Sequence, residues 1–305
     1  ESAAKSLRRW TPRSISYEAG RIVAKCLLDH GRYQKLDELA AKAGSDLSLL
    51  LALAEEARNL HHWLPAEPVK RIFKLLTRQQ IQVDHGDSNR APPLSAVLAV
   101  IETAYHHSIC DTAEARDLLA RYLPAQAPAH LSSRFDGSPT PYLRACALHA
   151  ALSHNSLELI DVASPTLKTE MQATKSHSKS QELREFEAQI GALIPWVNLW
   201  AQSFVNPLAK AQLIDAVAQA KSTSTPSWAH GYRDNPQTAN EIANLRIDIL
   251  LISSLADHGT IKELVDWTKT LKRPLFTPTL NRVTRLCATV AGAENFAFEM
   301  AENAA

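Results

Sequence analysis

Residues 28–31 read Leu28-Asp29-His30-Gly31 and lie between two stretches whose apolar residues have helical spacing. The same order, an apolar run, then His, then Gly or Asn, returns at residues 152–155 and at residues 256–259. Gly, and next best Asn, accepts the left-handed backbone that ends a helix. Each copy therefore predicts a helix, a tight turn and a second helix, with His30, His154 and His258 in the last turn of the first helix.

The composition also favours helices. Hydrophobic residues make up 45% of the 305-residue chain and only 9 residues are Gly. The periodic stretches are filled by Ala, Leu, Gln, Glu, Lys and Arg, which have high helix propensity. The sequence predicts an all-α fold with helices at 12–30, 33–43, 46–62, 67–80, 94–109, 112–123, 141–153, 157–173, 180–205, 207–221, 239–257, 261–272, 278–291 and 293–303.

Several helix starts have their own signals. A polar residue directly before Pro can cap the free amides, and Pro fits the first helical position. Capping boxes, in which a polar cap and a residue three positions later satisfy each other's backbone donors, predict further starts. The polar residue and Pro pairs are Thr11-Pro12, Thr140-Pro141, Asn206-Pro207 and Thr277-Pro278, and the boxes are Asp111 with Glu114, Ser178 with Gln181, Thr238 with Glu241 and Thr260 with Glu263.

About seven antiparallel helical hairpins follow from these elements. The spacing of the three His turns is unequal, so a strict array with one repeat length is excluded. We expect one continuous superhelix over 1–305, because each hairpin has an apolar face that only a neighbour can cover. Loops at 82–93 and 222–238 divide it into blocks 1–81, 94–221 and 239–305.

In this organisation the chain resembles an irregular α-solenoid of HEAT-like or tetratricopeptide-like hairpins. Stretches such as Ile15-Ser16-Tyr17-Glu18-Ala19-Gly20-Arg21 and Asp29-His30-Gly31-Arg32-Tyr33 also resemble, more loosely, the helical sensor region of bacterial STAND-type signalling proteins. The resemblance implies a sensing or scaffolding part of a larger multidomain protein. It assigns no functional residue.

The net charge and the positions of the cysteines limit the classes of partner and the cellular location that we expect. A formal net charge of +1 excludes a global field that would gather nucleic acid or an anionic membrane. The four cysteines lie far apart and none has a Cys-x-x-Cys partner, which favours reduced thiols and a cytoplasmic location. No apolar run approaches the length of a membrane span. The first residues lack an initiator Met and a signal core, so we interpret the chain as a piece of a longer protein.

Two surfaces are candidates for partner binding. The first is a basic helix face formed by Lys70, Arg71, Lys74 and Arg78, opposite the apolar face of helix 67–80. It can contact phosphates, or it is a solvated outer face. The second is the loop that carries Trp228, His230, Tyr232 and Arg233, residue types that anchor interfaces. The alternative is that Trp228 folds back onto the adjoining hairpin.

An apolar stripe in helix 180–205 alternates steps of three and four residues, as a two-helix seam requires. It can dimerise the protein as a coiled coil, although Pro195 interrupts it, or it can face neighbours of the same chain. Its members are Leu183, Phe186, Ile190, Leu193, Val197, Trp200 and Phe204.

The histidine pairs suggest a metal site without matching one. His61 lies beside His62, His106 beside His107, and Glu102 one turn before His106. The spacings match no established zinc site, so we interpret these residues as surface or capping histidines and expect no metal and no cofactor.

No phosphate loop, nucleophile elbow or dinucleotide Gly cluster is present in the sequence. We therefore expect a non-enzymatic protein-recognition or scaffold module with a protein partner. The alternatives are a helical-repeat nucleic-acid binder that uses residues 70–78, and an all-α enzyme whose site leaves no local motif.

Overall fold

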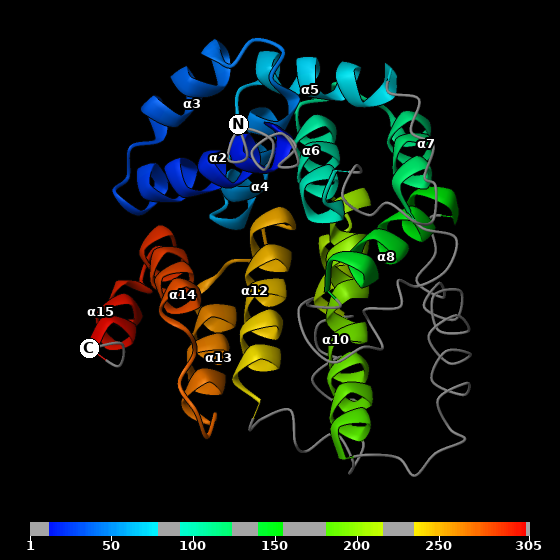
Figure 1. Cartoon of the computed structure of the whole chain (residues 1–305). Coiled ribbons are helices and arrows are strands. Elements are labelled where there is room, and N and C mark those ends of the chain that lie inside the picture. The colour runs from blue at the N-terminus through cyan, green and yellow to red at the C-terminus, as the bar shows by residue number, and fades with distance from the viewer. Residues whose placement is uncertain (1–11, 79–91, 124–139, 155–180, 216–234, 303–305) are drawn as a thin grey trace. The chain divides into compact units, whose positions relative to one another are not determined.

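The computed structural model describes residues 12–78, 92–123, 140–154, 181–215 and 235–302, which form helices and turns without a strand (Figure 1). Its contacts divide the chain into two compact units, Glu1–Ala125 and Gln126–Ala305. The all-α prediction is confirmed. The continuity of the two units in one superhelix stays a prediction. None of the described helices has the length and apolar character that crossing a membrane requires.

The first unit has two rows of helices. The inner row is α2 (Pro12–Asp29), α4 (Leu47–Asn59) and α6 (Leu94–His106), and the outer row is α3 (Tyr33–Lys42), α5 (Ala66–Arg78) and α7 (Thr112–Tyr122). Inner helices pack on inner neighbours, α2 on α4 and α4 on α6, and each also packs on the outer helix that follows it. Figure 1 shows the outer helices following one another along the upper edge of this unit.

The first two inner helices approach closely at a glycine. A Cβ atom added to Gly20 would lie 2.9 Å from both Ala52 Cβ and Leu49 Cδ1, a separation that real Cβ atoms do not tolerate. Gly20 therefore permits the contact between α2 and α4.

The second unit also contains a row of helices that contact one another in turn. Its helices are α8 (Thr140–His154), α10 (Gln181–Val205), α12 (Pro236–Ile252), α13 (His258–Lys269), α14 (Thr277–Thr289) and α15 (Glu294–Glu302). α10 packs on α8 and α12, α12 packs on α14, and α13 packs on α14 and α15. The even-numbered helices thus form a row in which each contacts the next.

The same type of turn follows four of these helices. At the ends of α2, α4, α6 and α12 a residue takes positive φ, and the amide after it donates to a carbonyl five residues back, which is the Schellman motif. The residues with positive φ are Gly31 (66°), His61 (57°), Ser108 (54°) and Ser254 (54°). The returning bonds, from N to O, are Arg32 to Leu27 (2.7 Å), His62 to Ala57 (2.8 Å), Ile109 to Ala104 (2.8 Å) and Leu255 to Leu250 (3.0 Å).

The predicted role of His30 is confirmed at this turn. His30 directly follows α2, and its Nδ1 atom lies 2.8 Å from the carbonyl oxygen of Cys26 in the last turn of the helix. Gly31 is the residue with the left-handed conformation. The prediction for His258 is wrong. Ser254 closes α12, and His258 is the first residue of α13, because Asp257 accepts from the Thr260 amide and caps that helix. Asn155, in the third copy, lies outside the described residues.

Several other predicted helix starts need correction. Thr277 does not cap α14 but is its first helical residue, after the N-cap residue Phe276. Asn235 caps α12 ahead of Pro236, so the helix begins before the predicted box of Thr238 and Glu241. Asp257 replaces Thr260 as the cap of α13, and its box partner is Thr260. Pro207 lies in a turn, and helical residues resume only at Lys210. The box of Asp111 and Glu114 is confirmed, with both reciprocal hydrogen bonds present.

Candidate functional site

Aromatic, imidazole and guanidinium groups meet where α4 and α6 end. Trp63, in the segment after α4, stacks on His106 at the end of α6, with ring centroids 4.1 Å apart and planes 6° apart. The Arg58 guanidinium carbon lies 3.9 Å from the centroid of the Trp63 ring. We name Arg58, Trp63, His106 and His107 the turn-end cluster.

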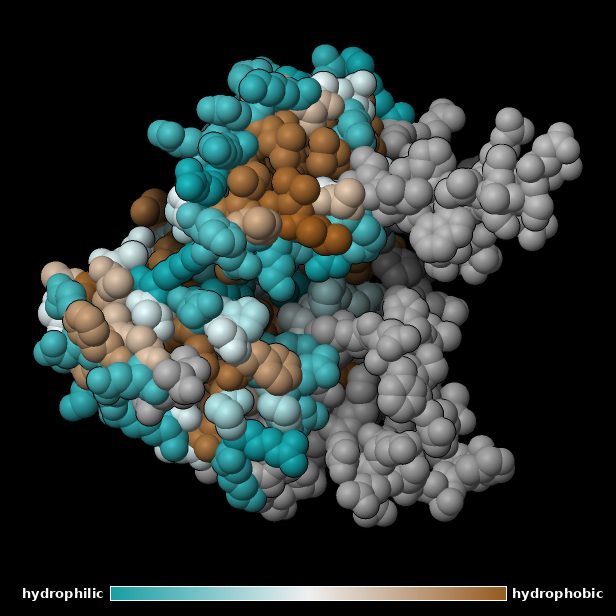
Figure 2. Space-filling model, turned by 60° about the vertical axis from the view of Figure 1, so that its left-hand side comes forward, coloured by the Kyte–Doolittle hydropathy of each residue, from teal (hydrophilic) through white to brown (hydrophobic). Residues whose placement is uncertain are grey.

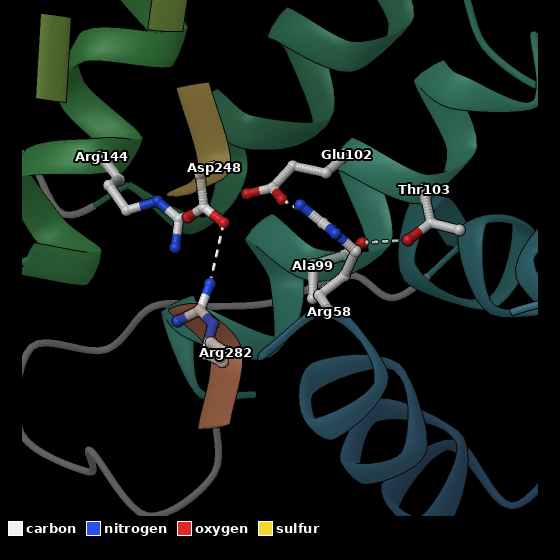
Figure 3. Close-up of polar contacts among 7 residues, drawn as sticks. All are labelled: Arg58, Ala99, Glu102, Thr103, Arg144, Asp248 and Arg282. Atoms are coloured by element: carbon white, nitrogen blue, oxygen red, sulfur yellow. Dashed lines mark hydrogen bonds and ion pairs between the residues drawn. The ribbon is translucent and has the colours of Figure 1, made fainter. Parts of the chain in front are cut away.

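A buried ion pair supports the cluster. Arg58 Nε donates to Glu102 Oε2 over 3.0 Å, and the two side chains are only 5% and 1% exposed (Figure 3). Next to Glu102 in the sequence, Thr103 donates to the carbonyl of Ala99 in the preceding turn of α6. A buried carboxylate needs such a partner, because an unpaired charge in a core is strongly unfavourable. The pair fixes the guanidinium against Trp63.

His107 of the cluster and His62 beside it connect the cluster to its surroundings. His107 Nε2 lies 2.7 Å from the carbonyl oxygen of Leu64, which ties the end of α6 to the segment after α4. His62 Nε2 lies 2.8 Å from Asp37 Oδ1 of α3, and its ring is 5.2 Å from that of Tyr33. The segment His61–Leu64 is therefore held by an inner helix on one side and by an outer helix on the other.

The electrostatics of the cluster favour a neutral His106. Partial burial, His107 and Arg58 together hold the pKa of His106 below its usual value. An uncharged imidazole can stack on Trp63 beside the Arg58 cation without adding a second positive charge. His106 itself is exposed and Trp63 is half-buried, so both can be reached from solvent.

The turn-end cluster combines an indole ring with two imidazole rings. No group of three or more His, Cys, Asp or Glu side chains in the described ranges is arranged to hold a metal ion. The cluster presents the half-buried Trp63, the exposed His106 and the half-buried His107 on the rigid base that the buried Arg58 provides, and Trp is a residue type that dominates binding energy at interfaces.

The second unit contains a related arrangement inside its row of helices. Asp248 of α12 accepts from Arg282 of α14 over 3.0 Å, and Arg144 of α8 lies 3.8 Å from its other oxygen. Figure 3 shows the Asp248 carboxylate between the two guanidinium groups. Arg144 also lies over the buried ring of Trp200 in α10, 4.2 Å from its centroid. Four successive helices of the row are thus joined by one polar network.

A second Arg in this unit also contacts tryptophans. The guanidinium of Arg246 lies 5.0 Å from the Trp196 ring centroid and 5.1 Å from the Trp267 ring centroid. Arg246 is itself buried, 9% exposed, so these contacts stabilise the fold and are not available to a ligand.

The predicted basic face is only partly a free surface. Lys70, Lys74 and Arg78 are exposed on α5, opposite the buried Val69, Ile72, Phe73 and Leu76, as predicted. Arg71 differs, because its Nη1 donates to the carbonyls of Ala41 and Gly44 (3.4 and 3.0 Å) and so covers the end of α3. Arg121 of α7 likewise donates to the carbonyl of Thr77 at the end of α5.

The other predicted surfaces have different outcomes. The loop with Trp228, His230, Tyr232 and Arg233 lies outside the described residues, as do the side chains of Leu183 and Phe186 in the apolar stripe. The remaining five stripe residues are buried, and α10 packs on α8 and α12 of its own unit. Those residues, Ile190, Leu193, Val197, Trp200 and Phe204, serve packing within the chain.

Sequence reasoning missed Trp63 and the role of Arg58. The signal was a run of His61, His62 and Trp63 directly after an apolar-periodic helix, with His106 and His107 placed likewise after another. When two parallel helices are neighbours, their last residues lie at the same surface. Imidazole pairs at the ends of both helices therefore indicate one shared surface.

No protein-family model matches the chain, and no curated protein is significantly similar to it.

Proposed function

We propose that this chain is a helical-repeat module of the α-solenoid type that recognises a protein partner, and that the turn-end cluster is part of its binding surface. It acts without catalysis, as the sensing or scaffolding part of a larger protein. The alternating packing supports the solenoid part of the proposal: within each unit a helix contacts the next helix of its own row, and in the step from α5 to α7 Arg121 and Tyr122 donate to carbonyls at the end of α5. Arrays built in this way present extended surfaces to partners.

The turn-end cluster supports recognition of a protein because its geometry is fixed before binding. The buried pair of Arg58 and Glu102 and the contact between His107 and Leu64 hold the exposed His106 and the half-buried Trp63 in place. Rigid aromatic anchors lose little conformational freedom when a partner binds, which favours affinity. Trp63 stacked on His106 is the observation on which the proposed site depends.

The experiment selects peptides from a displayed library against the full chain and measures their affinity for point variants. His106→Ala removes the exposed ring and leaves the buried pair intact, so we expect selected peptides to bind at least tenfold more weakly. Lys70→Ala, also exposed in the same unit, is the matched control and should change affinity less than twofold. Peptides that bind both variants like the wild type, or a selection that yields none, contradict the proposal.

A second candidate, nucleic-acid binding, is favoured by one observation. Lys70, Lys74 and Arg78 lie one turn apart along α5, are exposed, and form no ion pair within the described part of the chain. Contacts with a few phosphates would make affinity for single-stranded RNA fall steeply with salt. A binding curve that shows no salt dependence, or no change on Lys74→Ala, contradicts this candidate.

A further inference from the structure

The helix α2 has an exposed apolar face on the side opposite α4. Ile22 is 68% exposed and Val23 is 44% exposed, which is unusual for large aliphatic side chains. Ala19 and Cys26, one turn before and after them, are also exposed. Figure 2 shows a hydrophobic area on the surface of the first unit. The described large hydrophobic side chains exposed in that unit are Ile22 and Val23.

The position of this face in the fold indicates what covers it. In the inner row α4 has an inner neighbour on each side, α2 and α6. Among the described helices, α2 has such a neighbour only on the side of α4. Its other side therefore suits a further helix that carries a similar apolar stripe.

The charges beside the stripe match a second copy of α2. Glu18 and Lys25 are exposed on one edge of the stripe, seven residues apart, and neither forms an ion pair within the described ranges. Seven residues span two turns, about 10 Å, so the two cannot pair with each other. When two α2 helices lie antiparallel about a twofold axis near Ile22, Glu18 of one copy faces Lys25 of the other, and the same pair forms twice.

We propose that two copies of this chain associate through antiparallel α2 helices, with Ala19, Ile22, Val23 and Cys26 of each copy buried in the contact. This interface is separate from the turn-end cluster and does not depend on the proposed function. It also differs from the apolar stripe of α10, whose described members are buried inside the second unit.

The test measures the mass of the full chain by sedimentation equilibrium in reducing buffer, so that disulfides through Cys26 do not contribute. The wild type is expected to dimerise at micromolar concentration. Ile22→Asp places a charge in the contact and should leave the protein monomeric. Phe298→Asp, at an exposed aromatic on α15, is the control and should not change the dimer. Circular dichroism verifies that each variant is folded.

A charge exchange tests the antiparallel arrangement. Glu18→Lys and Lys25→Glu each set like charges against one another, so each should weaken dimerisation about tenfold. The double variant restores opposite charges and should return the dissociation constant to within about threefold of the wild type. A wild type that stays monomeric, a dimer that persists in Ile22→Asp, or a double variant no better than the single ones overturns the proposal.

Discussion

Arg58 of α4 and Glu102 of α6 form an ion pair of 3.0 Å in which both side chains are almost fully buried. The pair joins two inner helices through residues that lie 44 positions apart in the sequence, and it holds the guanidinium against Trp63. Its value lies in specifying how α4 and α6 align, because a buried pair contributes little net stability compared with apolar packing.

Removing one partner of this ion pair should lower the free energy of unfolding. Glu102→Gln leaves the Arg58 charge buried, and we expect the free energy of unfolding to fall by about 3 kcal/mol. The combination of Arg58→Met with Glu102→Leu removes both charges and should cost less than the single change. Urea unfolding measures each value. Glu38→Gln, at an exposed pair, is the control and should change stability by less than about 0.5 kcal/mol. Equal costs at Glu102 and Glu38 would contradict the role of the buried pair.

The Schellman motif predicts that a glycine at its left-handed position stabilises the protein. Ser254 holds a left-handed conformation that strains residues with a Cβ atom, so Ser254→Gly should stabilise the protein by about 0.5 kcal/mol. Gly31→Ala, at the equivalent position of α2, should destabilise it by about 1 kcal/mol. Thermal unfolding provides the measurement. The control is Ala41→Gly, at a helical position near the end of α3, which should destabilise the protein. A glycine is then stabilising only at the left-handed position of the turn. A loss of stability in Ser254→Gly would contradict the assignment.

The turn-end cluster predicts a depressed pKa for His106. Burial, His107 and Arg58 lower it, so as the pH falls below about 6.5 the unfolded chain binds this proton first. Stability contributed by the neutral ring is therefore present above that pH and is lost as the pH falls. NMR titration of the ring protons should show the pKa below the value in an unfolded peptide. His107→Gln removes the second cause and should raise the pKa; an unchanged titration curve in that variant contradicts the coupling.

The cysteines should differ in reactivity. Burial raises the pKa of Cys110 to about 12 and the pKa values of Cys146 and Cys287 to about 11, so these thiols stay protonated near neutral pH. Cys26 is exposed on α2. Because the thiolate is the nucleophile, iodoacetamide should label Cys26 first in the monomeric Ile22→Asp variant, and the others should react at similar rates only after unfolding. Mass spectrometry of a labelling time course checks the order; early labelling of Cys287 would be inconsistent with this fold.

Helix positions could be read from the sequence because apolar periodicity and proline position are local signals. The turns were only partly readable. Gly31 announces the end of α2, whereas Ser108, His61 and Ser254 take the same conformation without a glycine. Their left-handed backbone follows from the packing of the two flanking helices, which overrides local preference. The motif at residues 256–259 misled for a different, local reason: Asp257 caps a helix that starts where the pattern predicts an end.

The candidate site was harder to predict than the fold. The sequence draws attention to His62, His106 and His107, but contacts with Trp63, Leu64 and Asp37 depend on helices far apart along the chain. The basic face of α5 was predictable as an exposed face. Arg71 instead covers the end of α3, because the fold brings the carbonyl of Gly44 within hydrogen-bond distance of its guanidinium group. The sequence does not indicate this contact.

The helices of the first unit lie in series, with each outer helix beside the next. Pulsed electron paramagnetic resonance can measure this with spin labels on Lys35 of α3, Lys74 of α5 and Asp117 of α7, all exposed positions. The labels would be placed in pairs on the full chain after its cysteines are replaced. Packed neighbours lie about 8–10 Å apart between helix axes, so the account predicts that the distance from α3 to α7 clearly exceeds both neighbouring distances. Three similar distances would indicate a closed bundle and would contradict the serial arrangement.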